Sequence, residues 1–326
     1  MIEIIGLALV GIICIALLVL SAEYVVKKLI IIAKHYGVSD VFIGLTVLSI
    51  GTSLPEIASH FISSIGIVTG KLDYNIASAT VLGANIGSDV IQQTLILGVV
   101  ILLVGHLTFT KKFLFRSYSV MIGTTLMCLV LGWDQHYSRI DGFILFSTFL
   151  AYMYYLYKHE DMHQHVDHQK KKYNIHKQTL FAILGLGVLL VSSTIILKLV
   201  EHIVIMTQIG GSLIGVMSLG IASALPELIT ALQGVKNKAR GISIGTLIGS
   251  NITNPLVAIG GGALISTYFV PKPLIYWDLP METVTATILL IYLLFNKRKL
   301  GKGGAIYLIA LYLVYAVVRI MIFNVD

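Results

Sequence analysis

Charged residues are scarce in this chain: Asp, Glu, Lys and Arg make up only 12% of its 326 residues. Because so few polar side chains cannot cover the surface of a water-soluble globule of this length, a soluble globular protein is excluded. Hydrophobic residues make up 56% of the chain, and the mean hydropathy is +0.89. Lipid is therefore the expected outer solvent, and the composition predicts an integral membrane protein.

Cysteine is also rare. Cys14 and Cys128 both lie inside apolar runs, so they predict neither a disulfide framework nor a metal site, and we expect them to be packing residues. The first apolar run, residues 4–20, has neither a basic leader nor a small-residue cleavage site. We expect it to remain as the first membrane span.

No nucleophile–base constellation and no nucleotide-binding loop occurs in the sequence, so we expect neither an enzyme nor a cofactor. The formal net charge is +7, but the basic residues lie where an anionic inner leaflet would hold them. We therefore expect the lipid bilayer as the main surroundings, no nucleic-acid partner, and no obligate protein partner.

Ten apolar segments are predicted to span the membrane, from run length and flanking charge. They are residues 3–35, 40–66, 75–104, 113–133, 140–157, 178–208, 211–235, 241–267, 279–296 and 302–323. Several exceed the roughly 20 residues that a bilayer needs, so tilted or broken helices are expected.

The distribution of Lys and Arg predicts the orientation. With the N-terminus outside, the inner ends of the spans carry 18 of the 23 basic residues, as the positive-inside rule requires. The five on the outer side are Lys71, Arg139, Lys198, Lys272 and Arg319. We expect a multi-pass protein of the cell membrane with both termini extracellular and its central polar segment cytoplasmic.

That central segment, residues 158–177, separates two groups of five spans, residues 1–157 and 178–326. An odd number of spans per half means that the second half enters the membrane in the opposite sense. The expected fold is an all-α membrane protein of ten transmembrane helices, arranged as two inverted-topology five-helix repeats.

Two pairs of motifs support the repeat. Residues 51–56, Gly-Thr-Ser-Leu-Pro-Glu, return as Ala-Ser-Ala-Leu-Pro-Glu at 222–227. Residues 83–89, Gly-Ala-Asn-Ile-Gly-Ser-Asp, return as Gly-Thr-Leu-Ile-Gly-Ser-Asn at 245–251. Both pairs occur in the same order in the two halves, which chance does not easily supply.

The first motif places Glu56 and Glu227 directly after a proline inside an apolar stretch. An ionised side chain is expensive there unless something binds it, so both predict an ion site. The prolines remove backbone hydrogen bonds, and we expect carbonyls of Ser49, Gly51, Gly220 or Ala222 to be left free to face an ion.

Oxygen-bearing side chains recur at a spacing of four residues, which puts each pair on one helix face. The pairs are Thr52/Glu56, Ser88/Gln92, Ser223/Glu227 and Ser250/Asn254. Carboxylate, amide, hydroxyl and carbonyl oxygens without convergent His or Cys favour Ca²⁺ or Na⁺, and two glutamates match the charge of one Ca²⁺.

Each motif also has a purely structural interpretation. A single Pro-Glu can be a kink whose carboxylate is paired elsewhere, and Gly-x-x-x-Gly-Ser often serves helix packing. Duplication of both motifs favours ion binding. Asp89 lies one residue off the ligand face, so it is either a peripheral ligand or a partner of one. The central segment holds five histidines, which is compatible with a metal- or pH-sensing segment. Their spacings fit no closed metal site, so a solvated linker is favoured.

At these residues the chain resembles the sodium/calcium exchanger family, within the calcium/cation antiporters. Residues 51–56 look like the first alpha-repeat signature, and residues 249–254, Gly-Ser-Asn-Ile-Thr-Asn, look like its second-repeat partner. The resemblance implies exchange of Na⁺ for Ca²⁺, with spans 2, 3, 7 and 8 forming the ion site. Spans 1 and 6 would slide past that core to alternate access.

The resemblance also implies the ligands. Glu56 and Glu227 would be the main Ca²⁺ ligands. The remaining candidates for Ca²⁺ and Na⁺ are Thr52, Ser53, Ser88, Asp89, Gln92, Ser223, Ser250 and Asn254, with carbonyls near Ser49 and Gly220.

The chain departs from the family pattern at four positions: Asp89 and Gln92 stand where Asn is usual, Ser223 replaces Thr, and Ala224 replaces Ser. An Asp at the position of Asn254 is associated in relatives with potassium dependence or a protonatable centre, so Asn254 favours potassium-independent exchange. A proton/calcium or other cation antiporter and a potassium-dependent exchanger remain open. A channel is disfavoured by the clustered acids and the repeats.

Overall fold

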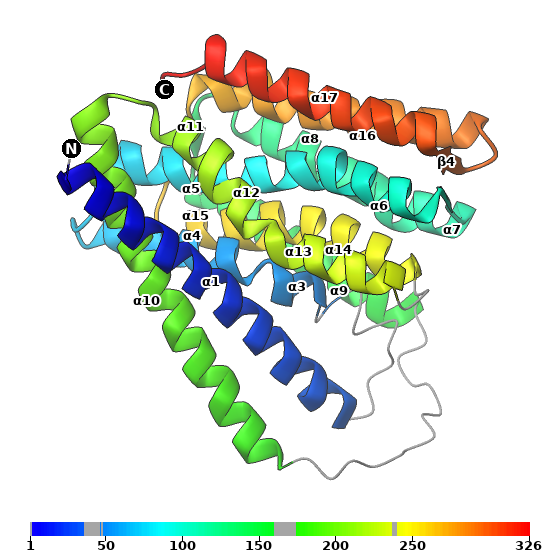
Figure 1. The fold of residues 1–326 in the computed structure, drawn as a ribbon, viewed down its shortest axis with the longest axis horizontal. Helices are drawn as coiled ribbons and strands as arrows, with labels where there is room; N and C mark the ends of the chain where they lie inside the picture. The colour runs from blue at the N-terminus through cyan, green and yellow to red at the C-terminus, as the bar shows by residue number, and fades with distance from the viewer. Residues whose placement is uncertain (1, 36–45, 47, 160–173, 237–239) are drawn as a thin grey trace.

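The computed structural model describes residues 2–35, 46, 48–159, 174–236 and 240–326. Nearly all of them are helical (Figure 1). In this part of the chain, nine helical segments are long and apolar enough to cross a membrane. The second predicted span contributes the apolar helix Leu54–Val68, but residues 36–45 and 47 before it lie outside the described residues. The histidines between residues 160 and 173 also lie outside the described residues.

The first half contains five groups of helices, several of which include short π-helical turns, labelled η. They are α1 (Ile2–His35); α3 (Ser49–Thr52) with α4 (Leu54–Val68); α5 (Tyr74–Ile91), η2 (Gln92–Ile96) and α6 (Leu97–Val104); α7 (Lys111–Phe113), η3 (Leu114–Tyr118) and α8 (Ser119–Leu131); and α9 (Arg139–His159).

The second half also contains five groups of helices in its described part. Its groups are α10 (Ile175–Thr207); α11 (Gly211–Ile214), η4 (Gly215–Leu219), α12 (Gly220–Ser223) and α13 (Leu225–Lys236); α14 (Arg240–Thr253), η5 (Asn254–Ile259) and α15 (Gly260–Ile265); η6 (Leu274–Asp278) with α16 (Leu279–Phe295); and α17 (Lys302–Met321).

Four very short strands connect the loops. Strand β1 (His106–Thr108) pairs antiparallel with β4 (Lys299–Gly301), and β2 (His136–Tyr137) pairs antiparallel with β3 (Tyr268–Phe269). Each pair therefore joins a loop of the first half to a loop of the second half. These pairings anchor the two halves to each other at the helix ends.

Two spans form the centre of the molecule. In Tyr74–Val104 and Ile244–Ile265, 78% and 83% of the most apolar stretch is buried, against 28–44% in the other seven spans. Every residue from Ala77 to Ile91 in α5 is buried. The second motif of each half thus lies in the two innermost spans, where side chains contact protein rather than lipid.

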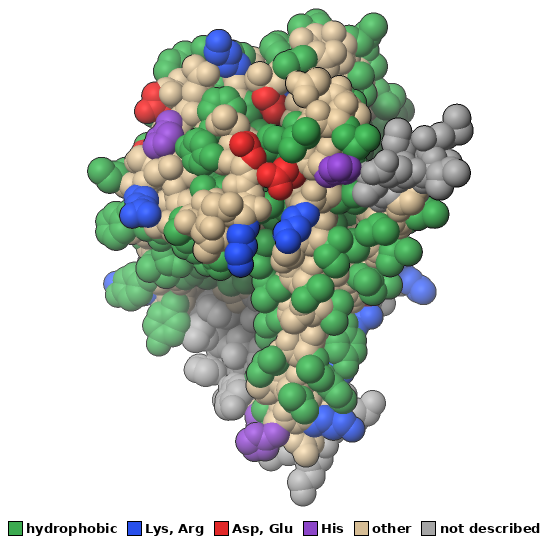
Figure 2. All heavy atoms as spheres, turned by 90° about the vertical axis from the view of Figure 1, so that its left-hand side faces the viewer, with side chains coloured by type: hydrophobic (Ala, Val, Ile, Leu, Met, Phe, Trp, Pro, Cys, Tyr) green, Lys and Arg blue, Asp and Glu red, His purple; other side chains and the backbone are tan. Residues whose placement is uncertain are grey.

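Helices α1 and α10 lie side by side along the outside of the bundle and extend beyond it (Figure 1). They approach closely at small residues: a Cβ on Gly185 would lie 2.7 Å from Val25. Their outer faces are apolar, with Ile12 and Ile183 largely exposed. Figure 2 shows hydrophobic side chains covering the projecting part. Such a surface is suited to lipid.

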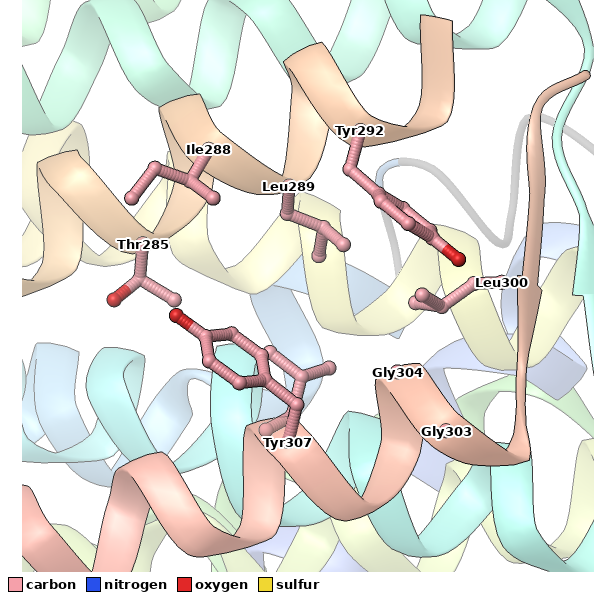
Figure 3. A pocket seen from close by; sticks show the side chains of 9 residues that line it. Thr285, Ile288, Leu289, Tyr292, Leu300, Gly303, Gly304 and Tyr307 are labelled. Carbon is pink, nitrogen blue, oxygen red and sulfur yellow. The ribbon is translucent and has the colours of Figure 1, made fainter. Parts of the chain in front are cut away.

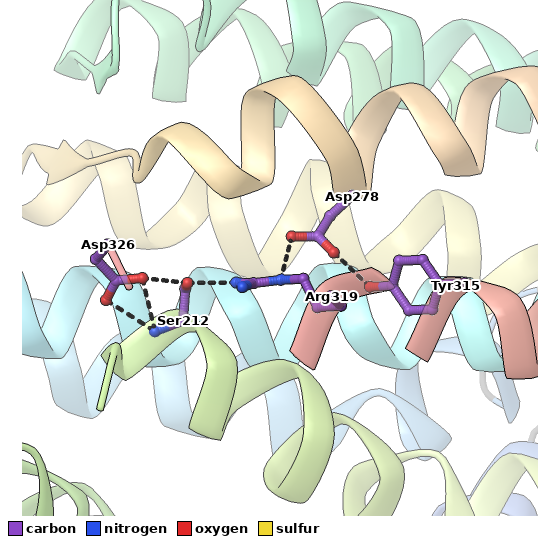
Figure 4. Close-up of polar contacts among 5 residues, drawn as sticks. All are labelled: Ser212, Asp278, Tyr315, Arg319 and Asp326. Carbon is purple, nitrogen blue, oxygen red and sulfur yellow. Dashed lines mark hydrogen bonds and ion pairs between the residues drawn. The ribbon is translucent and has the colours of Figure 1, made fainter. Parts of the chain in front are cut away.

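A buried polar network connects the C-terminal segment to α11 and η6 (Figure 4). Arg319 Nε lies 3.0 Å from Asp278, and both side chains have no exposure. Tyr315 donates a hydrogen bond of 2.5 Å to Asp278. Arg319 also donates to the Ser212 hydroxyl, which in turn donates to Asp326. Arg319 is therefore not a surface charge: partners compensate its burial.

The same network explains a wrong helix boundary. The sequence predicts, from run length and flanking charge, that the ninth span begins at residue 279. The helical segment begins at Leu274 instead. Because Asp278 is paired with Arg319, its charge is compatible with a position inside the span.

Candidate ion-binding site

Both Pro-Glu motifs lie at a break between two helices. Helix α3 ends at Thr52, and α4 begins at Leu54; likewise α12 ends at Ser223, and α13 begins at Leu225. The proline falls at the second position of the new helix, where its missing N–H costs little. The glutamates consequently lie in the first helical turn, where the helix dipole favours negative charge.

The carbonyls at these breaks are not free. The Ser49 oxygen accepts a bond of 3.2 Å from the Ser53 N–H and one of 3.4 Å from the Thr52 hydroxyl. The Gly220 oxygen accepts the corresponding bonds, of 3.2 and 3.3 Å, from the residues four and three positions later. The prediction that the prolines leave these two carbonyls without a partner is therefore wrong. An ion at either carbonyl oxygen would have to displace these two hydrogen-bond donors or bind the oxygen beside them.

The two glutamates are buried, Glu56 with 2% and Glu227 with 0% exposure. Ser88 donates a 2.7 Å hydrogen bond to Oε1 of Glu56. Within the described residues, Oε2 of Glu56 and both oxygens of Glu227 have no hydrogen-bond partner. The Ser223 hydroxyl makes a weaker hydrogen-bonding contact with Glu56, and the Thr52 hydroxyl makes one with Glu227, but neither contact has the distance and angle of a full hydrogen bond. Three buried carboxylate oxygens thus lack a donor, which is costly unless a cation binds them.

Gln92 connects the two central spans. Its Nε2 donates to the Ser88 hydroxyl at 3.0 Å, so these two side chains share a helix face as their spacing predicts. Its Oε1 accepts from the Ser250 hydroxyl at 2.6 Å and from Asn251 at 2.9 Å. The side chain therefore reaches across from η2 to α14. A hydrogen-bonded line runs from Glu56 to Ser250.

Asn254 faces Asp89. Its Nδ2 donates a 2.6 Å hydrogen bond to Asp89 Oδ1, and its Oδ1 has no partner among the described residues. The Asn254 backbone oxygen accepts from Asn85 at 3.3 Å. Asp89 is 2% exposed, and through this hydrogen bond it contacts Asn254, which is itself a predicted ligand.

The two remaining candidate residues lie at the first helix break. The Ser49 hydroxyl forms a hydrogen bond of 2.7 Å with the Thr253 hydroxyl, and the buried Ser53 hydroxyl has no partner within the described chain.

The donor atoms that come together are carboxylate, hydroxyl and amide oxygens. In the described part of the chain, no group of three or more His, Cys, Asp or Glu side chains could hold a metal ion. Hard cations such as Ca²⁺ and Na⁺ prefer oxygen ligands, whereas transition metals select imidazole and thiolate. The oxygen ligands of this site are therefore suited to hard cations such as Ca²⁺ and Na⁺.

Comparison with known proteins agrees with this chemistry. The sequence pattern of the family described as sodium/calcium exchanger protein matches residues 6–158 and 177–321, which include both Pro-Glu motifs. The chain belongs to the sodium/calcium exchanger family. It is therefore a membrane transporter, and the recognition of this family from the motifs is confirmed.

Relatives of this exchanger span most of its length. An uncharacterized membrane protein of Methanocaldococcus jannaschii is 28% identical over 283 residues, which cover 87% of this chain and 88% of the relative. The inner membrane protein YrbG of Escherichia coli is 30% identical over 263 residues, with 77% of each chain covered. The sodium/calcium exchanger MaX1 of Methanosarcina acetivorans is 25% identical over 320 residues, covering 85% of this chain and 88% of the relative.

Solved structures of the sodium-calcium exchanger NCX_Mj have the same fold as this exchanger. The structure soaked with 100 mM Na⁺ and 10 mM Sr²⁺ matches with a TM-score of 0.63 and 25% identity, over 95% of this chain and 96% of that chain. The structure soaked with 10 mM Na⁺ and no Ca²⁺ matches with a TM-score of 0.64 and 25% identity, over 98% of both chains.

Sequence reasoning missed a buried carboxylate beside the site of this exchanger. Glu282 on α16 is 3% exposed and accepts hydrogen bonds of 2.8 Å from both Gln93 and Thr125. Gln93 also donates to Asn251 at 2.7 Å, which connects Glu282 to the Gln92 line. Glu282 interacts electrostatically with Asp89. The sequence does contain a signal, because Glu282 shortly follows Pro280 in an apolar run. With the span predicted to begin at residue 279, Glu282 falls at the end of the helix and is not assigned to the site.

In the first half, the glycines of the second motif serve helix packing, as their structural interpretation predicts. A Cβ on Gly87 would lie 2.7 Å from the Cα of Val216, and one on Gly220 of the facing segment would lie 2.9 Å from the Ser88 nitrogen. Helix α5 and the α11–α12 segment thus meet backbone to backbone. The close approach brings Ser88 beside the second helix break. In this exchanger the packing and ion-binding interpretations are compatible.

Proposed function

We propose that this protein is a secondary antiporter that exchanges Na⁺ for Ca²⁺ at a single midplane site containing Glu56 and Glu227. The observation that carries the proposal is the state of these carboxylates: both are buried, and three of their four oxygens have no hydrogen-bond donor among the described residues. Two carboxylates match the charge of one Ca²⁺, and several Na⁺ can replace it.

The proposed ligand set is the one that the family resemblance implies, and the contacts described above support part of it. Glu56 and Glu227 are the main Ca²⁺ ligands in this proposal. The neutral ligands for Ca²⁺ and Na⁺ are Thr52, Ser53, Ser88, Gln92, Ser223, Ser250 and Asn254, with the carbonyls of Ser49 and Gly220. Gln92 Oε1 and the two carbonyls already accept hydrogen bonds, so ion binding would rearrange those donors. Asp89 orients Asn254 through its hydrogen bond.

The proposed architecture is ten helices in two inverted repeats, residues 1–157 and 178–326, joined by the linker 158–177. Local irregularities support it because four of the five described π-turns fall in pairs: η2 and η5 follow the second motif of each half, and η3 and η6 lie near the start of the next span. The strand pairs support it too. Exchanging the halves converts the β1–β4 pair into the β3–β2 pair, as a two-fold axis in the membrane plane requires.

Alternating access is assigned to α1 and α10. These two long helices contact each other along the outside of the bundle, and α10 also contacts α4, the helix that carries Glu56. A pair that slides as one body along α4 would open the site to one side of the membrane at a time. The proposed location is the cell membrane, with the linker in the cytoplasm and both termini outside.

Exchange of protons or another cation for Ca²⁺ is the second candidate function. The observation in its favour is that Asp89 and Glu282 are buried close to the site, and that the hydrogen bonds described for them come from neutral groups. Such carboxylates could carry protons. Asn254 in place of an acid favours Na⁺ exchange without K⁺.

The two candidates are separated by measuring ⁴⁵Ca²⁺ uptake into proteoliposomes with pH clamped on both sides and K⁺ omitted. Our proposal expects uptake only when an outward Na⁺ gradient is imposed. Uptake driven by a proton gradient, with Na⁺ absent, would support the second candidate and contradict the first.

A further inference from the structure

A groove lies between α16 and α17, and none of the candidate ion ligands lines it. Its volume is about 410 Å³. Its lining is mostly apolar and includes Ile288, Leu289, Tyr292, Leu300, Gly303 and Tyr307 (Figure 3). Both helices are candidate membrane spans, so the groove belongs to the membrane-embedded part of the chain.

The groove is open to the outside of the bundle. Its floor is buried, with Leu289 at 7% and Leu300 at 1% exposure, whereas the walls are half exposed: Ile288 at 48%, Tyr292 at 44% and Tyr307 at 52%. On a membrane span, such exposure means contact with lipid. The lining from Thr285 to Tyr292 covers about two turns of α16, roughly 10 Å along its axis. An extended hydrocarbon chain is suited to that shape.

A glycine holds the mouth of the groove open. A Cβ added to Gly303 would meet nothing within 4 Å, and its backbone has no positive φ. Neither a close neighbour in the described chain nor backbone geometry therefore requires glycine, although glycine costs up to about 1 kcal/mol relative to alanine in a helix. Any side chain at this position, on the first turn of α17, would occupy space at the mouth.

A cluster of positive charge adjoins this mouth. Lys297, Arg298, Lys299 and Lys302 are all exposed, and none forms an ion pair within the described residues. We call them the basic turn. Pairing of Lys299 with Thr108 in the β1–β4 ladder anchors it. Basic residues where a span leaves the membrane attract anionic lipid headgroups.

One hydroxyl lies between the apolar and charged parts. Tyr292 accepts a hydrogen bond of 2.8 Å from Asn296, directly before the basic turn. Its hydroxyl oxygen lies at the Leu300 end of the groove (Figure 3). A tyrosine hydroxyl can accept and donate at once, so Tyr292 can still donate to an ester or phosphate oxygen.

We propose that this groove is a binding site for an anionic phospholipid, with an acyl chain between α16 and α17 and its phosphate on the basic turn. The apolar lining accounts for the chain, and the four cations account for the preference for a negative headgroup. A zwitterionic lipid would gain only the apolar contacts. A second copy of this protein would bring its own positive charges to the basic turn and is therefore disfavoured.

The test is native mass spectrometry of the full-length protein in detergent, titrated with phosphatidylglycerol or phosphatidylcholine. The wild-type protein should bind phosphatidylglycerol at least about 100-fold more tightly than phosphatidylcholine. Replacing Lys297, Arg298 and Lys299 together by Gln should weaken it about 100-fold, at roughly fivefold per charge, and should leave phosphatidylcholine binding unchanged. These surface substitutions leave the buried structure intact.

A second variant tests the groove itself. Gly303→Leu should reduce binding of both lipids by about tenfold or more. Gly187→Leu is the matched control, because Gly187 is another exposed helical glycine whose added Cβ meets nothing within 4 Å. Equal affinity for the two lipids, or equal binding by the two leucine variants, would overturn the proposal. A dimer mass that Gly303→Leu converts to a monomer would show instead that a second copy covers the groove.

Discussion

The Ser88 hydroxyl donates a 2.7 Å hydrogen bond to Oε1 of Glu56, and Oε2 of the same carboxylate has no donor among the described residues. One half of the carboxylate is thus oriented by the protein, and the other half is open to a cation. Ser88 in turn accepts from Gln92, so the orientation of Glu56 depends on the neighbouring innermost span. This relationship allows the contribution of a single hydroxyl to be measured.

Ser88→Ala should raise the apparent Kd for Ca²⁺ by about tenfold, since a hydrogen bond to a charged group contributes about 1.5–3 kcal/mol. Ser78→Ala is the control: Ser78 is equally buried in α5, and its hydroxyl has no partner within the described residues. Calcium binding by both variants is measured by titration calorimetry. Equal affinities would show that the Ser88 bond does not orient Glu56 for binding.

Glu56→Gln and Glu227→Gln should each abolish calcium exchange, with a loss of at least about 100-fold, because one remaining carboxylate cannot neutralise Ca²⁺. Both variants should stay folded, since removal of a buried charge does not destabilise the empty carrier. Flux and thermal unfolding are measured together. Glu23→Gln is the control: Glu23 forms an i,i+4 ion pair with Lys27 on α1 and should not affect exchange. Normal flux in either central variant would remove the basis of the assignment.

Asn254→Asp should make exchange dependent on pH or K⁺. Asn254 Nδ2 lies 2.6 Å from Asp89, so the variant places two carboxylates face to face, and they cannot both be ionised without a proton or cation between them. Activity should fall as pH rises and this proton is lost, unless K⁺ is supplied. Adding Asp89→Asn restores one carboxylate and one amide, and should restore the wild-type pH profile. If the single variant keeps that profile, the two residues do not act as a pair.

Accessibility of cysteines should reveal the orientation. A cysteine in place of Gln169 in the central linker should react with a membrane-impermeant thiol reagent only from the cytoplasmic side. A cysteine in place of the exposed Lys272 should react only from outside. The background is low because Cys14 and Cys128 are buried. The reverse labelling pattern in intact cells would invert the proposed topology.

Much of the fold could be predicted from the sequence, because a segment that crosses the lipid bilayer must be long and apolar. Hydrophobic run length gave most segments to within a few residues, and the Pro-Glu pairs indicated Glu56 and Glu227 because buried acids are costly in a membrane. The exception at Leu274 has a physical reason. Whether Asp278 can lie within a span depends on Arg319, which follows 41 positions later, and no local pattern encodes that pair.

The contacts within the site could be predicted less well from the sequence. Helical periodicity predicts which residues share a helix face, but not which other helix that face contacts. Gln92 bonds Ser250 and Asn251, whereas Gln93 bonds Glu282. A π-helical turn begins at Gln92, and its wider turn changes the direction of the side chains that follow. A periodicity of 3.6 residues per turn correctly predicts that Gln92 shares a face with Ser88, but it does not predict that Gln93 contacts Glu282 on another helix.

The most direct test of the account is competition between Na⁺ and Ca²⁺ in the purified protein. A cage with two glutamates holds either one Ca²⁺ or several Na⁺, so increasing Na⁺ should raise the apparent Kd for Ca²⁺ progressively. In proteoliposomes without K⁺ and with pH clamped, an imposed Na⁺ gradient should then drive ⁴⁵Ca²⁺ uptake. Calcium binding that does not change with Na⁺, or flux that requires K⁺, would contradict a shared Na⁺/Ca²⁺ site at Glu56 and Glu227.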